Sequence, residues 1–461
     1  MSDSRAQNAR MLASMAGLDE GAAAERLDRS VLITCGPGFA QAAWAAEMRV
    51  LIERTVRVTD IPDQADLELV VGTAMRRSVA PALWAGIGCD EAMVGSAPVS
   101  VREGPTEPLF AASAACSVVA AVLRRVIAAD ALPPVPDPLR MAARELGIPE
   151  GAMPELDLSG TVLVGAGAVA NGFLRALRHL PVRGELAVID PKEVASGVLN
   201  RCLFFTEADV GHPKALALAT RAAPHLPGVR LVPYVEDFGA YARRVGTVPR
   251  AVVTVDSRRA RRVIQKFIPG EIVDGSTTDA RAVVVHSHRQ PTTHACLACV
   301  YRNVPEEHAR ERSIAEGLGV SLTDVQEGFI SKAAAARIAA SYPDTNLASL
   351  VGKGYDTVFR ERCSSQALLL PEGRQVLAPF AFVSALAGTL MVVELLRMAA
   401  GSAVTNYWSA DPWRGPIART RRLLEPHQNC EFCSRPESIE VARQLWGYAR
   451  HAAANAGGRS K

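Results

Sequence analysis

The sequence has few of the features that mark exported, membrane-spanning or nucleic-acid-binding proteins. Its 51 basic and 48 acidic side chains leave a formal net charge of only +3 over 461 residues, which gives no electrostatic case for nucleic acid as a partner. The N-terminus has no apolar signal-peptide core, so we expect no export. The longest apolar run, from Val376 to Val393, is short for a membrane span and is followed by Glu394 and Arg397. A buried helix is the better prediction for it.

Cysteine usage also argues against a disulfide framework. Four of the nine cysteines form two CxxC pairs and the other five are scattered, which suits a reducing cytoplasm and a metal site. Each pair can present two thiolates from one tight turn, and two pairs close a tetrahedral, structural zinc site. The predicted ligands are Cys296, Cys299, Cys430 and Cys433. The alternative is four reduced core cysteines, and the weaker candidate ligands are three histidines expected in the loop just upstream, His286, His288 and His294.

What the sequence does contain is a nucleotide-binding pattern. The apolar run TVLV enters the turn GAGAVANG, and a second apolar run, ELAVID, ends at Asp190. Gly165 and Gly167 would let the backbone approach a phosphate, and Asp190 can accept hydrogen bonds from ribose hydroxyls. Two cations follow, Arg201 and Lys214, where a dinucleotide dehydrogenase would not need them. They point to a triphosphate.

A third apolar run, RAVVTVD, ends at Asp256. We expect this carboxylate at the carboxyl edge of the sheet, where ligands gather in α/β proteins and where it could hold magnesium. The alternative is that Asp256 caps the helix that follows it, which is compatible with a metal role. The four arginines at positions 258, 259, 261 and 262 are predicted to form a solvated face.

The chain also repeats itself. SVLITCGPGFAQAAW aligns with GTVLVGAGAVANGFL, which places Thr34 opposite Gly165 and Gly36 opposite Gly167. In the same register TVRVTD lies opposite ELAVID, DLELVVG opposite RAVVTVD, and PLFAASAACSVVAAVLRR opposite PFAFVSALAGTLMVVELLR. Nothing in the first copy corresponds to LNR or GHPKA. We therefore interpret the first half as a Rossmann unit that kept its core and lost its nucleotide chemistry.

Together these motifs resemble those of the ThiF/MoeB and ubiquitin-activating enzyme superfamily. GAGAVANG is similar to its GxGGxG turn, LNRCLFF to its NLNRQFLF segment, DVGHPKA to its D(I/V)GxxKA, VTVDS to its magnesium aspartate, and the CxxC pairs to its zinc site. The turn departs from the family pattern at Ala168 and Ala170, and the LNR segment departs at Val198 and Cys202. We expect the two alanine methyl groups to narrow the space beside the phosphates.

The resemblance implies an α/β fold with two Rossmann-like, ThiF-type units in one chain, pseudo-dimeric, with the zinc site in the second. The expected domains are an inactive adenylation-like unit (1–135), a linker and helix (136–157) marked by the prolines of ADALPPVPDPL, an active adenylation unit (158–437) with a crossover insert at about 300–375, and a C-terminal helix with a frayed tail (438–461). The implied cofactors are ATP, Mg²⁺ and Zn²⁺. The implied nucleotide-binding residues are Gly165, Gly167, Ala168, Asp190, Asn200, Arg201, Lys214 and Asp256, the last also as the magnesium ligand.

Arg201 and Lys214 would also act in catalysis, and two further catalytic residues are implied. Family members take an arginine from the neighbouring Rossmann unit, about twenty residues before its first strand; Arg10 has that position here, with Arg26 and Arg29 as alternatives. Many activating enzymes then capture the acyl group on a cysteine in the crossover loop.

The cysteine of this crossover interval is Cys363, and Arg360 and Arg362 flank it. Adjacent cations favour the nucleophilic thiolate. The alternative is an incidental loop cysteine.

The fused arrangement of an inactive and an active unit resembles eukaryotic activating enzymes and the shorter bacterial versions in ubiquitin-like conjugation operons, for which antiviral defence is one role. It implies ATP-dependent activation of the C-terminal carboxylate of a ubiquitin-like protein, thioester formation on Cys363, and transfer to a conjugating enzyme. These two proteins are the expected partners, without nucleic acid or membrane, and the chain would be a cytoplasmic pseudo-dimeric monomer or a homodimer. The alternatives are adenylation of a natural-product peptide or a sulfur-carrier protein, and a non-catalytic nucleotide-binding scaffold.

Overall fold

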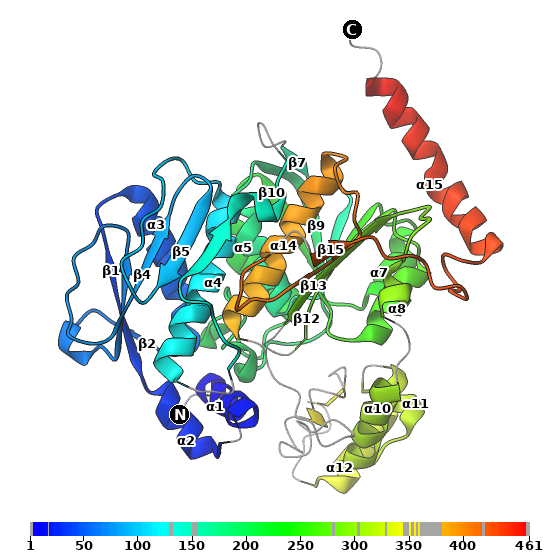
Figure 1. Ribbon diagram of the computed structural model, residues 1–461. Coiled ribbons are helices and arrows are strands. Elements are labelled where there is room, and N and C mark those ends of the chain that lie inside the picture. Colours follow the sequence, from blue (N-terminus) through cyan, green and yellow to red (C-terminus); the bar gives the residue numbers. More distant parts are fainter. Residues whose placement is uncertain are drawn as a thin grey trace.

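The computed structural model describes residues 3–16, 18–128, 132–149, 155–278, 282–301, 305–327, 330–343, 350–351, 355, 358–359, 380–416 and 420–457. These residues form two α/β units built on separate sheets, with a small helical insert and a C-terminal helix (Figure 1).

The first unit contains a six-stranded sheet in the order β2-β1-β3-β4-β5-β6. The four strands β2, β1, β3 and β4 run parallel, and β5 pairs antiparallel with both β4 and β6. The strands are β1 (Ser30–Cys35), β2 (Arg57–Thr59), β3 (Leu67–Val71), β4 (Ala82–Ile87), β5 (Glu91–Gly95) and β6 (Leu139–Ala142). The helices of this unit are α1 (Asp3–Ala16), α2 (Glu20–Leu27), α3 (Phe39–Glu53) and α4 (Pro108–Ile127). All five residues of β3 are buried, as expected for a parallel strand covered on both faces.

The second unit contains a nine-stranded sheet in the order β10-β9-β8-β11-β12-β13-β14-β15, with β7 paired to β9. Its strands are β7 (Leu156–Asp157), β8 (Thr161–Val164), β9 (Val182–Ile189), β10 (Val229–Tyr234), β11 (Arg250–Val253), β12 (Glu271–Thr278), β13 (Ala282–Arg289), β14 (Tyr407–Ala410) and β15 (Arg421–Arg422). Its main helices are α5 (Ala168–Leu177), α6 (Lys214–Ala222), α7 (Phe238–Val245), α8 (Arg258–Lys266) and α14 (Ala381–Ala399).

The two sheets confirm the internal duplication. β1 lies between β2 and β3 as β8 lies between β9 and β11, with parallel pairing in all four cases. In each unit an antiparallel pair follows, β4 with β5 and β12 with β13. α4 and α14, which the repeated sequence places opposite each other, come after these pairs in the chain. The predicted α/β class with two parallel-dominated sheets is therefore correct.

The two units share one hydrophobic core, which runs from α1 in the first unit to α14 in the second. α14 packs closely on α5 and also contacts α4. Both α4 and α14 are long and apolar enough to span a membrane, but 83% and 100% of their apolar windows are buried inside the protein. The prediction of a buried helix is confirmed from Ala381 onward, where the described part of that run begins.

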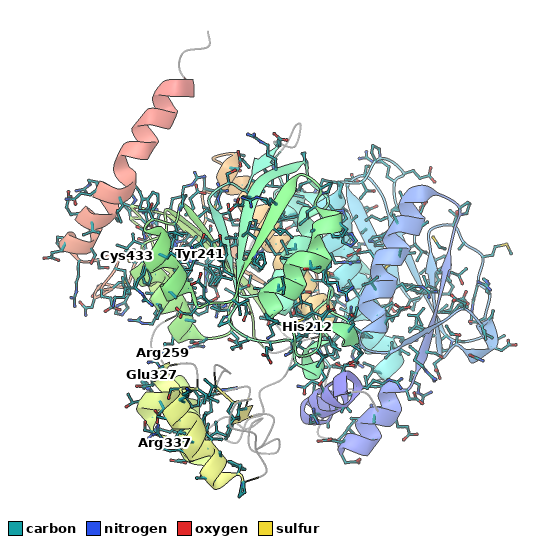
Figure 2. The ribbon with its side chains drawn as sticks, turned by 180° about the vertical axis from the view of Figure 1, so that it is seen from behind. His212, Tyr241, Arg259, Glu327, Arg337 and Cys433 are labelled. Atoms are coloured by element: carbon teal, nitrogen blue, oxygen red, sulfur yellow. The ribbon has the colours of Figure 1, made fainter. Side chains whose placement is uncertain are left out.

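Two further segments extend the second unit. The insert contains α10 (Pro305–Leu318), α11 (Leu322–Glu327) and α12 (Lys332–Ser341) around a small core of its own. Arg259 on α8 forms a 2.8 Å ion pair with Glu311 of the insert. Figure 2 labels Arg259 beside the insert. The C-terminal helix α15 (Pro436–Gly457) projects from the body of the protein (Figure 1).

The interval between the units differs from its prediction as a linker and helix. Residues 136–157 include β6, which completes the first sheet by pairing with β5, and β7, which pairs with β9 of the second sheet. The short strand β6 has only two fully buried residues, so its sequence carries little strand signal.

Candidate functional site

The glycine turn at the end of β8 is fixed from two sides. Gly165 has φ of +96°, a conformation that favours glycine, and its N–H donates to the carbonyl of Ile189 at 2.8 Å. A methyl group on Gly165 would lie 3.0 Å from Thr254 Oγ1. That hydroxyl in turn bonds the carbonyl oxygens of Val164 and Gly165, each at 3.0 Å. The turn therefore requires glycine at position 165.

Gly167 has open space in front of it. It is the residue before the first turn of α5. Among the described residues no side chain caps that helix, and a methyl group at position 167 would meet none of their atoms within 4 Å. The first backbone N–H groups of a helix lack partners within the helix and favour anions such as phosphate. The start of α5 is therefore an open cradle for a phosphate group.

Asp190 lies against this turn. One carboxylate oxygen accepts from the N–H of Ala166 and the other from the N–H of Lys192, both at 2.8 Å. The carbonyl of Lys192 accepts from the N–H of Lys214 at 2.8 Å. The predicted ribose aspartate and the predicted phosphate lysine are thus linked through a single residue between them.

The LNR segment is held by the first unit. Asn200 is 2% exposed, donates to Oδ1 of Asn8 on α1 at 2.9 Å, and accepts from Arg201 at 2.9 Å. Arg54, which follows α3, donates to the carbonyls of Leu199 and Leu203 at 2.6 and 2.9 Å. The first unit therefore positions the backbone on both sides of Arg201.

The four predicted zinc ligands come together. Their ligand atoms all lie within 4.8 Å of one another, and three Sγ–Sγ distances are 3.4, 3.6 and 3.9 Å. Zn–S bonds of about 2.3 Å in a tetrahedron place sulfurs about 3.8 Å apart, so the cluster fits zinc.

The model of the ThiF family matches residues 142–432, well over half of the chain. The chain belongs to the ThiF family. As a ThiF-family protein it is an enzyme of the adenylyltransferase type, and the resemblance drawn from its motifs is confirmed.

The ThiF-family chain is also matched over residues 1–149 by the model described as E1 N-terminal domain. The uncharacterized protein y4jF of Sinorhizobium fredii is 26% identical over 361 residues, which cover 71% of this chain and 69% of that protein. Solved structures of E. coli MccB with MccA-N7isoASN and with ATP are 13% and 12% identical, with TM-scores of 0.36 and 0.35. They cover 60% and 59% of this chain and 67% and 65% of theirs.

In this ThiF-family chain Asp256 lies at the carboxyl end of β11 with its side chain 72% exposed. Its carboxylate is 3.9 Å from Nζ of Lys192. Ser257, not Asp256, caps α8 by accepting from the N–H of Ala260. The capping alternative for Asp256 is therefore wrong, and its carboxylate faces solvent beside a lysine.

The two alanines of the turn do not both face the phosphate side. Ala170 is fully buried and belongs to the shared core, and Ala168 packs against the same core while partly exposed. The expectation that both methyl groups narrow the phosphate space is wrong for Ala170, because its position on α5 faces inward.

Two groups of basic and histidine residues also differ from their predictions. Arg261 is 2% exposed rather than solvated, and it pairs with the buried Asp274 at 2.7 Å under the ring of Tyr301. His286 and His288 are buried residues of β13 rather than loop residues, and burial lowers the pKa of both. All three side chains support the sheet and lie outside the four-cysteine cluster.

The three candidate arginines of the first unit take different positions. Arg10 lies on α1, whose residues contact the 3₁₀ turn Ser196–Val198 just before Asn200. Arg26 donates to the carbonyl of Ala128, and Arg29 pairs with Asp66 at 3.0 Å. Of the three, Arg10 is on the helix that reaches the second unit. Cys363 and its flanking arginines lie outside the described residues.

Two residues of the site were missed by the sequence analysis. Asn171 is fully buried, donates to the carbonyl of Gly167 at 2.8 Å and accepts from the N–H of Phe204 at 2.9 Å, so it ties the glycine turn to the LNR segment. Lys192 connects Asp190, Lys214 and Asp256 as described above. The sequence signal for Asn171 was a polar residue in the otherwise apolar first turns of the helix after the glycine turn. The sequence carries no comparable signal for Lys192.

The copy of the turn in the first unit is closed by the chain itself. A methyl group at Gly36 would lie 3.2 Å from the backbone nitrogens of Thr73 and Ala74. Thr34 donates to the buried Glu68 at 2.6 Å, and Glu68 also accepts from the N–H groups of the loop after β3. The space that stays open at Gly167 is filled here.

Proposed function

We propose that the protein activates the C-terminal carboxylate of a ubiquitin-like protein by ATP-dependent adenylation. The observation that carries this proposal is the hydrogen-bonded link between the glycine turn, Asp190 and Lys214. Asn171 ties the same turn to the segment that contains Arg201. The first unit, which we interpret as inactive, is hydrogen-bonded to the LNR segment through Asn8 and Arg54. Its match to the E1 N-terminal domain model supports a ubiquitin-like protein as the substrate class.

The residues fit magnesium ATP as substrate. The start of α5 would accept a phosphate, Asp190 the ribose hydroxyls, and Arg201 and Lys214 the negative charge of the departing pyrophosphate. Mg²⁺ in such sites uses one or two carboxylates together with phosphates and water, which suits the single exposed carboxylate of Asp256. Arg10 would add a cation from the first unit.

In the first step an oxygen of the substrate carboxylate bonds to the α-phosphorus as the bond to the β-phosphate breaks, and pyrophosphate leaves. In the second step the Cys363 thiolate bonds to the acyl carbon and AMP leaves, giving a thioester for transfer to a conjugating enzyme. A reducing compartment would keep this thiol free.

The first step is tested by ATP–pyrophosphate exchange in the presence of the ubiquitin-like substrate. Lys214→Ala and Asp256→Ala should lower exchange by about a hundredfold or more, the scale for losing one preorganised charge-stabilising group. Lys266→Ala, which removes an exposed lysine of α8 away from the turn, is the matched control. Full exchange in either site variant would refute the assignment.

The second step is tested separately. Cys363→Ala should keep exchange but lose the thiol-sensitive conjugate between enzyme and substrate, whereas Cys89→Ala should keep both. A conjugate of wild-type yield in Cys363→Ala would remove this cysteine from the mechanism. If exchange persists with a short peptide and no thioester forms, the natural-product alternative replaces the proposal.

A further inference from the structure

Lys192 brings a cation that the proposed function does not use to the edge of the sheet that holds the glycine turn. Its backbone N–H donates to one oxygen of Asp190, and the other oxygen accepts from the N–H of Ala166 inside the turn, both at 2.8 Å. Its Nζ lies 3.9 Å from the carboxylate of Asp256. The backbone of Lys192 is therefore anchored beside the turn, while its ammonium group reaches the predicted magnesium ligand.

The strand order shows which path this side chain takes. β8 lies between β9 and β11, and the three strands end level, because Val164 of β8 pairs with Ile189 of β9 and with Val253 of β11. Neighbouring strands are about 4.8 Å apart, so the ends of β9 and β11 are separated by about 10 Å. Lys192 follows β9, and Asp256 follows β11. The lysine side chain therefore crosses the end of β8, where the glycine turn begins.

The contact between Lys192 and Asp256 is one that a ligand can replace. The two side chains are 29% and 72% exposed, and exposed ion pairs contribute little to stability. The electrostatic field of Asp256 also reaches Arg261. That guanidinium is 2% exposed and is fixed on Asp274 at 2.7 Å, so it cannot move to a ligand as the lysine can.

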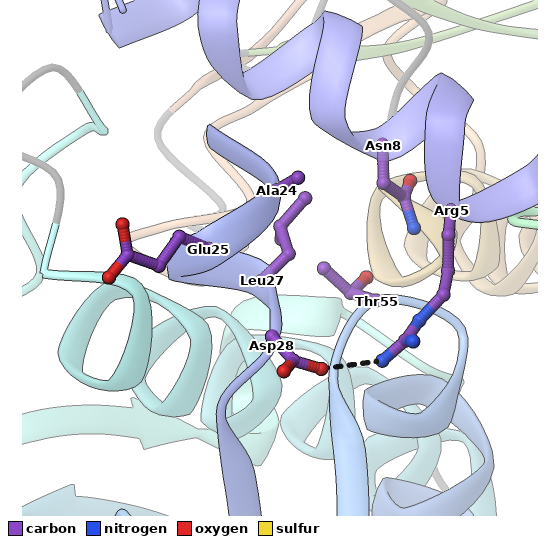
Figure 3. A pocket seen from close by; sticks show the side chains of 7 residues that line it. All are labelled: Arg5, Asn8, Ala24, Glu25, Leu27, Asp28 and Thr55. Atoms are coloured by element: carbon purple, nitrogen blue, oxygen red, sulfur yellow. Dashed lines mark hydrogen bonds and ion pairs between the residues drawn. The ribbon is translucent and has the colours of Figure 1, made fainter. Parts of the chain in front are cut away.

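Arg201 is also held more firmly than Lys192. Its guanidinium donates to Asn200 at 2.9 Å and to the carbonyl of Gly197 at 3.1 Å. Asn200 is in turn bonded to Asn8, which lies on α1 (Figure 3). Arg201 thus has a fixed position, whereas the ammonium group of Lys192 can turn to a phosphate.

The charge of the candidate site favours a further cation. Within the second unit, the charged side chains assigned to the nucleotide cancel, because two are acidic and two are basic: Asp190, Asp256, Arg201 and Lys214. ATP carries more negative charge than one Mg²⁺ neutralises, so the complex arrives with a net negative charge. Lys192 gives this part of the site the net positive charge that attracts such a substrate.

We propose that Lys192 is a further phosphate-binding residue of the candidate adenylation site, and that it changes partner from Asp256 to the phosphates when Asp256 takes up magnesium. In the empty site the ammonium group neutralises Asp256. With magnesium ATP bound, the carboxylate is a metal ligand and the ammonium group pairs with phosphate at the glycine turn. This assignment rests on the proposed function, because it takes ATP and magnesium as the ligands.

The experiment is calorimetric titration of the full chain with ATP, once in Mg²⁺ and once in EDTA. Lys192→Met should weaken ATP binding about tenfold or more in Mg²⁺, the scale for losing a charged hydrogen-bond partner. In EDTA the lysine stays on Asp256, so the same variant should weaken binding less than about threefold. On an Asp256→Ala background the lysine has lost that partner, and Lys192→Met should then cost about tenfold in EDTA as well. Lys192→Arg keeps the charge and should restore most of the affinity in Mg²⁺.

Controls separate this assignment from the proposed function. Lys266→Met removes an exposed lysine at the end of α8 and should bind ATP as the wild type does under both conditions. Thermal unfolding checks that each variant is folded. Wild-type affinity of Lys192→Met in Mg²⁺ would overturn the assignment and leave the proposed function intact. Equal weakening in Mg²⁺ and in EDTA would overturn the change of partner, since a lysine that only supports the turn would act in both. A wild-type chain that binds no ATP would overturn the proposed function and this assignment with it.

Discussion

The close contact between α5 and α14 gives a sharp test of how the second unit is held together. A methyl group at Gly172 would lie 2.5 Å from the carbonyl oxygen of Ser384 and 2.9 Å from Cα of Ala385. On the other helix, a methyl group at Gly388 would lie 2.1 Å from the backbone nitrogen of Phe173. The two helices therefore touch through backbone atoms, and Gly172→Ala should force them apart.

The cost can be worked from these distances. An ordinary contact begins near 3.4 Å, so α14 must retreat by about 0.9 Å, enough to forfeit a quarter to a half of the dispersion energy at the contact. Overpacking of a dense core costs about 1–3 kcal/mol, and backbone opposition favours the upper end. Alanine regains about 1 kcal/mol of helix propensity over glycine. The expected net loss in the free energy of unfolding is about 2 kcal/mol.

This loss should lower the melting temperature by roughly 4–8 °C for a unit of this size, measured by differential scanning calorimetry. Gly197→Ala is the matched control, because a methyl group there would meet no atom of the described residues within 4 Å. Its melting temperature should stay within about 1 °C of the wild type. A Gly172→Ala protein as stable as the wild type would refute the backbone contact between the two helices.

Three further predictions address the metal, the interface and the LNR segment. Cys430→Ser should lose the single zinc ion per chain that metal analysis of the wild type should find. Glu47→Gln should lower stability at pH 7 by about 3 kcal/mol, because Glu47 pairs with Arg175 at 2.7 Å with both side chains 12% exposed. Burial alone would raise the pKa of Glu47, but Arg175 lowers it below 4.5, so this stability is present above pH 4.5 and lost as the pH falls further. Arg54→Met removes the bonds to the backbone around Arg201 and should weaken ATP binding about tenfold, measured by calorimetry.

Each of these has its own contrary outcome. Cys35→Ser should keep its zinc, and zinc retained in Cys430→Ser would mean that this thiol is not a ligand. The difference in the free energy of unfolding between wild type and Glu47→Gln should shrink from pH 7 to pH 3. A difference that stays constant over this range would show that the carboxylate charge is not what stabilises the protein. The control is Arg49→Met, which changes a half-buried arginine of α3 that pairs with Asp60. Equal ATP affinity in Arg49→Met and Arg54→Met would show that the bonds from Arg54 to the LNR segment do not affect ATP binding.

Local patterns were enough to predict the strands, the repeat and the cysteine cluster. Strand-length apolar runs, the glycine turn and the CxxC spacing are properties of neighbouring residues, and the two sheets reproduce the alignment of the two halves strand by strand. The four thiols meet because β13 and the segment after β15 bring two distant turns together. The spacing predicts that the four-cysteine site exists, but it does not predict which other residues surround it.

The errors concern residues whose environment is set by distant parts of the chain. Ala170 faces the core because α14 covers that side of α5, and a turn motif carries no information on that. The sequence around Arg261 predicts a solvated side chain, but Asp274 on β12 and Tyr301, which follows α9 (Leu297–Val300), enclose it. A helix charge pattern cannot show which member of a basic run has a buried partner.

The structure gives a physical reason for keeping a copy of the unit without an open turn. In the first unit the loop after β3 fills the turn and is bound by Glu68, so the loop gains order where a nucleotide would lie. The same unit supplies Asn8 and Arg54 to the LNR segment and Glu47 to α5. Residues that position a cation beside a phosphate must be rigid to be effective, since misplacement by about 1 Å can cost a hundredfold in rate. Under the proposed function the first unit binds no nucleotide, so it can be selected for that rigidity alone. A pair of identical active units would also have to meet the needs of their own sites.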